Sequence, residues 1–529
     1  MTKKWNLPSN PDLPLLAQVM QSRNITGQEL HNTLDDLPDE ALLANIEEVA
    51  ERIRDALYKN EPLVIFGHDD PDGITSSYVL YRYLESCGYQ KHHYFIPNRN
   101  LEHHGIQNSF LEYVKKGKYP LVITVDNGIS GYDGIETLKQ MGCEVLVTDH
   151  HLIQPDQIPD AYAILNPQLQ ESNYPFRMLA GVGVVLMLIR YLSKLLEHPV
   201  EPALYFWTAI GSIADKVPMT SVNRLIVRYV IDNWDKVHDN TIDFLLRNHN
   251  RISGVTDKLG FMQYCSRLIA NGREQNGEHI ALKFMLELSD EKVRLFQLLE
   301  EEKNNWEAAL NNVFKLIDTL LEDYDGQAFI YFDDEDLIPY SLLGTAATYV
   351  VNNLNIPTIL LKNRHNVMVC EGRCNHNFNM MDAFNYCKEN LIQYGGHAKA
   401  AGFTMLPERY DAFIDAFHEF LKQHEEIAKS SDTIIIDGVI SCETVNNKLW
   451  HDLDILMPYG QENPEPVILV KDCTIEQLAD RFSFDNSSVH ITYEGKCDIA
   501  LQLKGTNLVK ILDYHIINPA QAENQFLAK

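Results

Sequence analysis

PLVIFGHDDPDGITSSYVLYRYLESCG, residues 62–88, is the stretch that decides how this chain folds. Its apolar run, short polar segment and long mixed stretch predict a strand, a turn and a helix in succession. Further β-rich runs alternate with helical stretches: HHYFIP, LVITVD, EVLVTD and AYAILNP. Such alternation is typical of a parallel sheet covered by helices. We therefore predict an α/β domain at residues 61–250, preceded by a mostly helical segment at residues 1–60.

The rest of the chain divides into three parts. Apolar residues recur at helical spacing from Asp290 to about Asp323, which predicts one long helix in a linking region at 251–325, with Ser289 or Asp290 as its N-cap. A second α/β domain is expected at 326–430, with strands QAFIYF, PTILLK and VMVCEG, helices at 380–393 and about 407–428, and a glycine-rich turn GGHAKAAG. The runs TIIIDGVI, PVILVKDCTI, SSVHITYEG, CDIALQLKG and LVKILDYHII predict a small all-β barrel or sandwich at 431–529.

Composition is that of a folded, multidomain protein: 529 residues, 45% hydrophobic and 22% charged. The formal net charge of -29 disfavours a polyanionic partner, although carboxylates that bind divalent metals become part of an anion-attracting site. Because there is no membrane-length apolar run and the start of the sequence lacks the apolar core of a secretory signal, we expect a cytoplasmic protein. The nine scattered cysteines are expected to be reduced, with neither a disulfide framework nor a CxxC zinc site.

The polar segment HDDPDG carries candidate metal ligands. In an extended segment His68, Asp70 and Asp72 alternate onto one side, so that an imidazole and two carboxylates converge. Gly73 allows a tight turn, and the N-terminus of the following helix is suited to a phosphate. By itself the segment is also compatible with a polar strand-to-helix turn that Asp72 caps.

Polar residues at three more element ends favour the metal site. Asp126 lies at the end of the predicted strand in LVITVDNG. Asp149, His150 and His151 end EVLVTDHH, and Asp215 follows a predicted helix in IGSIADKVP. Imidazole combined with carboxylate suits Mn²⁺ or a related ion better than a thiolate zinc site would. So many ligands with one shared carboxylate indicate two ions about 3.5–4 Å apart, which clamp the attacking and leaving oxygens of a phosphoester.

Other histidines and glycines have simpler interpretations. His92-His93 and His103-His104 do not close a strong strand and are expected in surface loops, with His103 or His104 as possible edges of the site. The glycines of AGVGVV lack the rest of a nucleotide fingerprint and are assigned to close helix packing near the site. Because no GxxxxGK[ST] pattern occurs, ATP hydrolysis is not expected.

The motifs HDDPDG, VDNG, TDHH and ADKVP resemble, in order and spacing, the four motifs of the DHH phosphoesterases. The resemblance is closer to the RecJ exonucleases than to the pyrophosphatases or oligonucleotide phosphatases of that family. It continues through YFIPNR, ILNPQ, YPFRMLAGVGV, RLIANGR, YGGHAKAAGF and PYGQENPEPV, and so covers nearly the entire chain. It implies an α/β fold with a parallel-sheet DHH domain, a long connecting helix, a DHH-associated domain and a C-terminal OB-like domain, a module that commonly binds single strands.

The resemblance also implies a role for individual residues. The implied ligands are His68 and Asp70 for one ion, Asp72, His150 and Asp215 for the other, and Asp126 bridging both. His151 would contact the scissile phosphate and, with Asp126, act in catalysis. The implied substrate-binding residues are Arg99, Arg273, Arg373, Gly395, Gly396 and His397.

Some positions depart from the family pattern. His68 stands where RecJ proteins usually have Asp, although other branches of the family use His there. Glu371, in CEGRC, stands where a terminal phosphate is expected, and its carboxylate would repel that phosphate. The usual His-Pro-Gly is replaced by IPYS at 338–341, and Ile269 and Asn271 replace Asn and Ala. The metal chemistry is therefore expected to be intact, whereas substrate recognition has changed.

The activity implied is 5′-to-3′ exonuclease action on single-stranded DNA in repair and recombination, with two divalent ions, Mn²⁺ or alternatively Mg²⁺. Implied partners are single-stranded DNA and a single-strand-binding protein or repair helicase, with no membrane, for a monomeric enzyme. The net charge and Glu371 favour an alternative, a phosphodiesterase of short oligonucleotides or dinucleotides. A third hypothesis, a repair scaffold without catalysis, is disfavoured because every expected metal ligand is present.

Overall fold

A computed structural model gives the fold, and its contacts divide the chain into two compact units. The first unit contains residues 7–303 and 436–529, and the second contains residues 1–6 and 304–435. The residues that the structure describes are 4–98, 105–153, 158–250, 252, 254–272, 274–275, 278–322, 324–364, 366–374, 378–424, 433–445, 448–485, 489–504 and 508–517. Among the described helices, none combines the length and the apolar character needed to span a membrane.

A five-stranded parallel sheet, in the order β3-β2-β4-β5-β6, forms the centre of the first unit. Its strands are β2 (Leu63–Phe66), β3 (His92–Phe95), β4 (Leu121–Val125), β5 (Glu144–Thr148) and β6 (Ala163–Leu165). Every residue of β2 and β4 is buried, because a parallel sheet is covered on both faces and its strands are apolar throughout. The predicted parallel-sheet α/β fold is confirmed.

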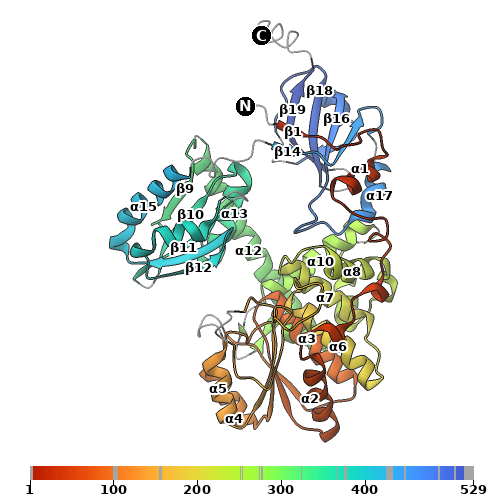
Figure 1. The fold of residues 1–529 in the computed structure, drawn as a ribbon, viewed down its shortest axis with the longest axis vertical. Coiled ribbons are helices and arrows are strands. Elements are labelled where there is room, and N and C mark those ends of the chain that lie inside the picture. Colours follow the sequence, from red (N-terminus) through yellow and green to blue (C-terminus); the bar gives the residue numbers. More distant parts are fainter. Residues whose placement is uncertain are drawn as a thin grey trace. The chain divides into compact units, whose positions relative to one another are not determined.

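Helices cover both faces of this sheet (Figure 1). One face carries α4 (Asn108–Gly117) and α5 (Tyr132–Gln140), and the other carries α2 (Ile46–Lys59), α3 (Pro71–Ser86) and α6 (Gly181–Leu196). The side chains of β4 show the division: Val122 packs with the first pair of helices, and Ile123 packs with the second group. Because the strands are parallel, the polar loops that follow them open at one edge of the sheet.

More helices extend the first unit beyond α6. They are α7 (Pro202–Ala214), α8 (Ser221–Asp232), α9 (Asn240–Arg247), α10 (Val255–Ala270) and α11 (Ile280–Leu286). A short antiparallel pair, β7 (Glu274–Gln275) and β8 (Glu278–His279), lies between α10 and α11. Helices α3, α6 and α7 pack on one another, so the helical part is continuous with the core beside the sheet.

The predicted long helix is α12, Glu291–Leu321. Ser289 Oγ accepts a hydrogen bond from Glu291 N at 3.3 Å, so the Ser289 side chain caps the start of this helix. Near this end, the buried Lys292 ammonium donates to Thr241 Oγ1 and to the carbonyl oxygens of Phe284 and Glu287. The start of α12 is therefore fixed to α9 and α11 in the first unit.

A mixed five-stranded sheet, in the order β12-β13-β11-β10-β9, forms the second unit. The strands are β9 (Phe329–Asp333), β10 (Thr358–Arg364), β11 (Val367–Arg373), β12 (Gln393–His397) and β13 (Ala400–Met405), and the helices are α13 (Leu343–Leu354), α14 (Met380–Tyr386) and α15 (Tyr410–Gln423). The glycine-rich segment is a β-hairpin rather than a simple turn, since Gly395 pairs with Gly402. The helix expected through residue 393 ends at Tyr386, because the following residues turn into the edge strand β12.

The C-terminal sheet has the order β15-β16-β18-β19-β17 and belongs to the first unit. Its elements are β15 (Gly438–Ser441), β16 (Val467–Cys473), β17 (Ser483–Phe484), β18 (Cys497–Leu503), β19 (Leu508–Ile516), α17 (Lys448–Leu453) and α18 (Ile475–Ala479). The run TIIIDGVI is divided, since β14 (Thr433–Ile435) pairs with β1 (Lys4–Asn6) in the second unit and only the later residues form β15. The predicted C-terminal β-rich domain is confirmed.

Two expectations for this domain are wrong. The described part of SSVHITYEG, residues 489–495, belongs to no strand, although Ile491 and Tyr493 are buried and contribute to the core. Cys442 and Cys473 form a disulfide, with Cα atoms 5.1 Å apart, whereas all cysteines were expected to be reduced. The pair comes together because β15 and β16 are hydrogen-bonded neighbours, which a sequence separation of 31 does not reveal.

Candidate metal centre

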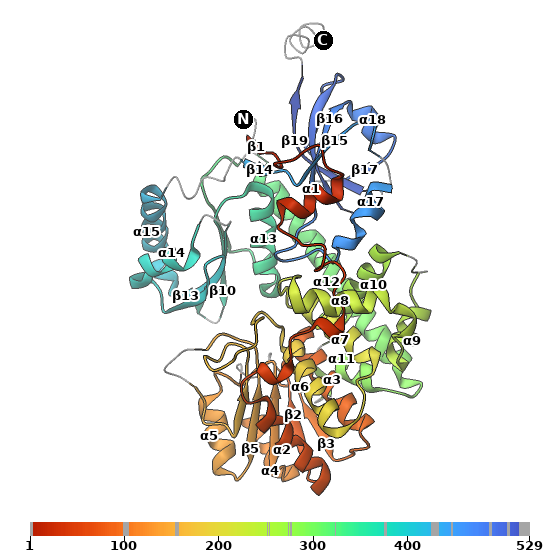
Figure 2. The ribbon, with the colours of Figure 1, turned by 45° about the vertical axis from the view of Figure 1, so that its right-hand side comes forward.

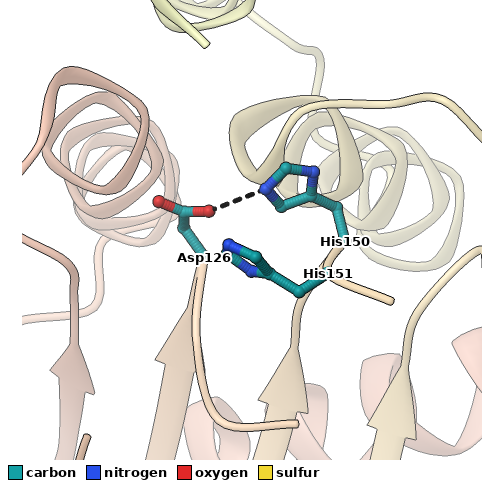
Figure 3. A group of neighbouring side chains, drawn as sticks. All are labelled: Asp126, His150 and His151. Carbon is teal, nitrogen blue, oxygen red and sulfur yellow. Dashed lines mark ion pairs between the residues drawn. The ribbon is translucent and has the colours of Figure 1, made fainter. Parts of the chain in front are cut away.

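All six predicted ligands come together at the carboxyl edge of the parallel sheet. One group joins His68, Asp70 and Asp126, and a second joins Asp72, His150 and Asp215; within each group one ligand atom per residue lies within 4.8 Å of the others. Asp126 also forms a group with His150 and His151 (Figure 3). The loops after β2, β4 and β5, the first turn of α3 (Asp72) and the end of α7 supply these residues.

The first group is formed by the turn from β2 into α3. His68 Nδ1 lies 3.1 Å from Asp70 Oδ2 and 3.7 Å from Asp126 Oδ2. Asp70 is the N-cap of α3 and accepts a hydrogen bond from Gly73 N at 2.9 Å, while Pro71 occupies the first helical position. The cap therefore fixes one carboxylate beside the imidazole.

The second group surrounds His150. Its Nε2 lies 3.1 Å from Asp126 Oδ1 and 3.8 Å from Asp72 Oδ2, and its Nδ1 lies 3.8 Å from Asp215 Oδ2. Asp72 is buried in the first turn of α3, and Asp215 is the C-cap of α7 with its side chain 30% exposed. The end of β4, the start of α3 and the end of α7 therefore each place a carboxylate near the His150 imidazole.

Asp126 lies between the two groups. Its Oδ2 faces His68 and its Oδ1 faces His150, so one carboxylate is shared by both. Directly after β4, this residue has φ of +58°, a left-handed conformation that is uncommon for a non-glycine residue. Backbone strain of this kind is concentrated at functional sites, where the surrounding structure holds it in place.

The charge balance of these groups fits a divalent cation. Burial, followed by repulsion from Asp72 and other carboxylates, raises the pKa of Asp126 well above its usual value, and the same causes raise the pKa of Asp215 to about 8. Asp126 Oδ1 is buried and accepts no hydrogen bond from the described residues. A metal ion would neutralise this cluster, and a donor set of imidazole nitrogens and carboxylate oxygens suits Mn²⁺ better than Mg²⁺, which prefers oxygen ligands alone.

Asp149 contributes a contact that the sequence did not reveal. Its buried Oδ1 lies 2.7 Å from His151 Nδ1, and its Oδ2 accepts a hydrogen bond from Ile129 N at 2.9 Å. The hydrogen bond to Asp149 raises the pKa of His151 and outweighs burial, which lowers it. The resulting pKa is about 9, so the imidazole is positively charged at neutral pH. The signal available in the sequence was its position before the His pair, at the end of a buried strand.

The start of α6 is a second contribution that was only partly predicted. Gly181 N and Val182 N donate hydrogen bonds to the two oxygens of Asp72, at 2.6 and 2.8 Å. A Cβ on Gly181 would lie 2.6 Å from Asp126 Oδ1, so the absence of a side chain lets the helix approach this carboxylate. Close helix packing near the site was expected from AGVGVV, but the hydrogen bonds to a candidate ligand were not.

A cavity of about 240 Å³ opens beside the first group. Its lining includes His68, Asp126, His151 and the loop at residues 128–131, which leads into α5. Space for part of a substrate is therefore present directly beside the clustered carboxylates.

The predicted substrate-binding residues are only partly described. Arg99, Arg273, His103 and His104 lie outside the described residues, as does the side chain of His397. Gly395 and Gly396 lie in strand β12, and a Cβ on Gly395 would meet nothing within 4 Å. The expected surface position of His92 is wrong: it is buried in β3 against Tyr81 and Tyr89, at the end of the strand that is distant from the ligand loops.

Arg373 and Glu371 form an ion pair on β11. Arg373 Nη1 lies 2.9 Å from Glu371 Oε2, and both side chains remain about a quarter exposed, at 25% and 29%. Residues two apart in a strand share a face, which brings these two side chains together. The carboxylate that was expected to repel a terminal phosphate is therefore paired with Arg373 itself.

Comparison with protein families matches two parts of the chain. A family model described as "DHH family, N-terminal domain" matches residues 62–211, which contain all the ligand loops except that of Asp215. A second, described as "RecJ OB domain", matches residues 436–498.

Curated relatives are similar over most of the chain. Single-stranded-DNA-specific exonuclease RecJ of Bacillus subtilis is 28% identical over 484 residues, which are 88% of this chain and 59% of that protein. The protein of the same name from Salmonella typhimurium is 27% identical over 482 residues, 86% of this chain and 82% of that protein. The chain thus spans about three fifths of the Bacillus relative.

Solved structures share the fold. RecJ from Thermus thermophilus in complex with Mn²⁺ superposes with a TM-score of 0.76 and 21% identity, over 97% of this chain and 80% of that one. A structure of exonuclease RecJ bound to manganese superposes with a TM-score of 0.59 and 23% identity, over 72% of this chain and 95% of that one.

Proposed function

Because this chain combines a DHH-family domain with a RecJ OB domain and resembles RecJ exonucleases over most of its length, we propose that it is a metal-dependent exonuclease of single-stranded DNA. The observation that carries the proposal is Asp126, whose two oxygens face two separate groups of nitrogen and oxygen ligands. Two ions, Mn²⁺ or Mg²⁺, would be held by these groups and would stabilise the attacking and leaving oxygens of the phosphodiester.

His151 supplies a second element of the mechanism. Its Nδ1 is engaged by Asp149, which fixes the ring and keeps it positively charged, so its Nε2 is available to donate to an oxygen of the scissile phosphate. The phosphate gains negative charge in the transition state, and a preorganised donor at that point stabilises it. Asp149 thus acts as a positioning residue, through His151.

The finer parts of the proposal follow from the resemblance. We assign 5′-to-3′ polarity, a role in DNA repair and recombination, a cytoplasmic monomer, and a single-strand-binding protein or repair helicase as partner. Arg99, Arg273, Arg373, Gly395, Gly396 and His397 are assigned to the substrate. The net charge of -29 does not oppose DNA binding at the centre itself, because two divalent ions would neutralise the four carboxylate ligands there.

Single strands are expected to be degraded faster than duplex of the same sequence, because an OB domain and an open ligand edge suit unpaired nucleotides. The test incubates full-length protein and Mn²⁺ with 5′-labelled and 3′-labelled strands, with blunt duplex, and with dinucleotides. A 5′ exonuclease releases the 5′ label first as a mononucleotide and shortens the 3′-labelled strand progressively. Equal rates on blunt duplex and single strand would refute the proposal, and preferred cleavage of dinucleotides would favour a short-oligonucleotide phosphodiesterase.

That second function is favoured by one specific observation, the pairing of Glu371 with Arg373. A terminal phosphate would have to compete with Glu371 for the guanidinium, and the carboxylate would repel it. Replacing Glu371 by serine is expected to raise kcat/KM several-fold on 5′-phosphorylated strands and to change it little on 5′-hydroxyl strands. The gain is modest because a partly exposed pair is worth about 1 kcal/mol or less.

Glu408→Ser, which removes an exposed carboxylate from the same unit, serves as the control. Kinetics on matched 5′-phosphate and 5′-hydroxyl strands give the result. If Glu371→Ser changes both substrates equally, or slows the phosphorylated one, Arg373 does not face a terminal phosphate.

A further inference from the structure

The segment PYGQENP, residues 458–464, is a self-supported loop of the OB domain. Gly460 and Asn463 form an antiparallel bridge, with Gly460 N donating to Asn463 O at 2.8 Å. The buried Asn463 side chain donates to Leu456 O and to Pro458 O, at 2.9 and 2.7 Å. The backbone of the loop is therefore held internally, and we call residues 458–463 the OB loop.

Helix α1 (Leu15–Ser22) and the residue after it support one side of the OB loop. This helix lies beside the C-terminal sheet in both views (Figures 1 and 2), and Gln18 exchanges two hydrogen bonds with the backbone of Val439. Arg23 pairs with Asp437 through two hydrogen bonds, at 3.0 and 2.8 Å, and also donates to Asn463 Oδ1 at 3.2 Å. The N-terminal segment thus fastens the OB loop to its own sheet.

The other side of the OB loop contacts the segment that follows Asp215. Met219 N donates to Gln461 O at 2.8 Å, and a Cβ on Gly460 would lie 2.7 Å from Met219 Cγ. Two arginines of α8 extend the contact: Arg224 donates to Ile455 O at 2.6 Å, and Arg228 donates to Asp454 O at 3.1 Å. The OB domain is therefore joined to α8 and to the short connection between α7 and α8.

That connection begins at a candidate ligand. Asp215 caps α7, Lys216 turns the chain with φ of +58°, and Met219 is buried just before α8 begins. Whereas the Asp72 carboxylate receives two backbone hydrogen bonds, the Asp215 carboxylate accepts none from the described residues and is the more exposed of the two. The backbone of Asp215 is held on its N-terminal side by α7, where Asp215 N donates to Gly211 O at 2.9 Å, and on its C-terminal side by the connection.

We propose that the OB loop is a positioning element of the metal centre: by fixing Met219 it fixes the connection that begins at Asp215, so the OB domain supports metal binding. The inference rests on the proposed function, because it takes Asp215 as a ligand. It assigns PYGQENPEPV a role distinct from contact with DNA.

The test uses the full-length protein with Gly460→Val, which pushes Met219 away, and with the double variant Arg224→Ala/Arg228→Ala, which removes the contacts of α8. Both are expected to lower Mn²⁺ affinity about 10- to 100-fold, the usual effect of groups that orient ligands. Mn²⁺ binding is measured by electron paramagnetic resonance, and circular dichroism verifies that each variant is folded. Excess Mn²⁺ is expected to restore nuclease activity.

Lys496→Ala, which breaks an exposed ion pair with Asp472 elsewhere in the OB domain, is the control and should bind Mn²⁺ as the wild type does. Unchanged Mn²⁺ affinity in both folded variants overturns the inference, as does an activity loss that excess Mn²⁺ does not restore. If one variant does not fold, the other decides. Wild-type protein that binds Mn²⁺ but leaves single-stranded DNA intact would contradict the proposed function, while weaker Mn²⁺ binding in the variants would still support the role of the OB loop.

Discussion

Replacing Asp126 by alanine is expected to abolish nuclease turnover while the protein remains folded. Both ligand groups lose their shared carboxylate, since Oδ1 faces His150 and Oδ2 faces His68. Loss of a group that only orients a ligand typically costs 10- to 100-fold, so loss of the shared ligand should cost more than about a hundredfold in kcat/KM. Rates on single-stranded DNA at saturating Mn²⁺ provide the measurement.

Replacing Asp126 lowers activity, but it should not lower the stability of the metal-free protein. The raised pKa of Asp126 means that folding disfavours the ionised carboxylate, so without metal its charge destabilises the folded state at neutral pH. The isosteric Asp126→Asn removes that charge, and its melting temperature in EDTA should be at least that of the wild type. Mn²⁺ should raise the melting temperature of the wild type but raise that of the variant much less.

The matched control is Asp133→Asn, which replaces an exposed carboxylate in the first turn of α5 and should retain the wild-type rate. More than a few per cent of the wild-type rate in Asp126→Ala would show that the carboxylate is not a shared ligand.

The parts of the structure that depend on local pattern were predictable from the sequence. Continuous apolar runs identified the parallel strands, and the regular spacing of apolar residues identified α12 and Ser289 at its start. The clustering of the six candidate ligands could be predicted because each stands at or near the end of an element, and parallel strands bring such ends to one edge.

The parts that depend on contacts between distant residues were not predictable. Nothing in AGVGVV indicates which carboxylate its backbone binds, because Asp72 is more than a hundred residues earlier. Cys442 and Cys473 meet only once β15 and β16 are paired, and the hairpin at Gly395 forms through pairing with β13. The ion pair of Glu371 and Arg373 is different, because the spacing of two residues in a predicted strand already placed both side chains on one face.

At Gly181 the addition of a single methyl group should have a large effect on the metal centre. Its amide and that of Val182 bind the Asp72 carboxylate, and its Cα lies against Asp126, one carboxylate from each ligand group. Adding one methyl group places a carbon 2.6 Å from both Cβ and Oδ1 of Asp126, closer than nonbonded atoms tolerate. Either the carboxylate or the start of α6 has to move.

Gly181→Ala is therefore expected to lower Mn²⁺ affinity and kcat/KM by about 10- to 100-fold, since one substitution displaces a ligand and the donors to another. The measurement is a Mn²⁺ titration followed by initial rates on single-stranded DNA across the same Mn²⁺ range.

The control lies two residues further along the same helix. A Cβ on Gly183 would meet Leu179 at 3.4 Å, an ordinary van der Waals contact, so Gly183→Ala changes the helix without changing the site. Intrinsic helix propensity favours alanine over glycine, by about 1 kcal/mol in a helix interior, so propensity alone predicts no loss of stability in either variant. Only the steric contact with Asp126 should make Gly181→Ala behave differently from Gly183→Ala. If Gly181→Ala binds Mn²⁺ and cleaves DNA as Gly183→Ala does, the carboxylates adjust freely, and the start of α6 does not determine the geometry of the metal centre.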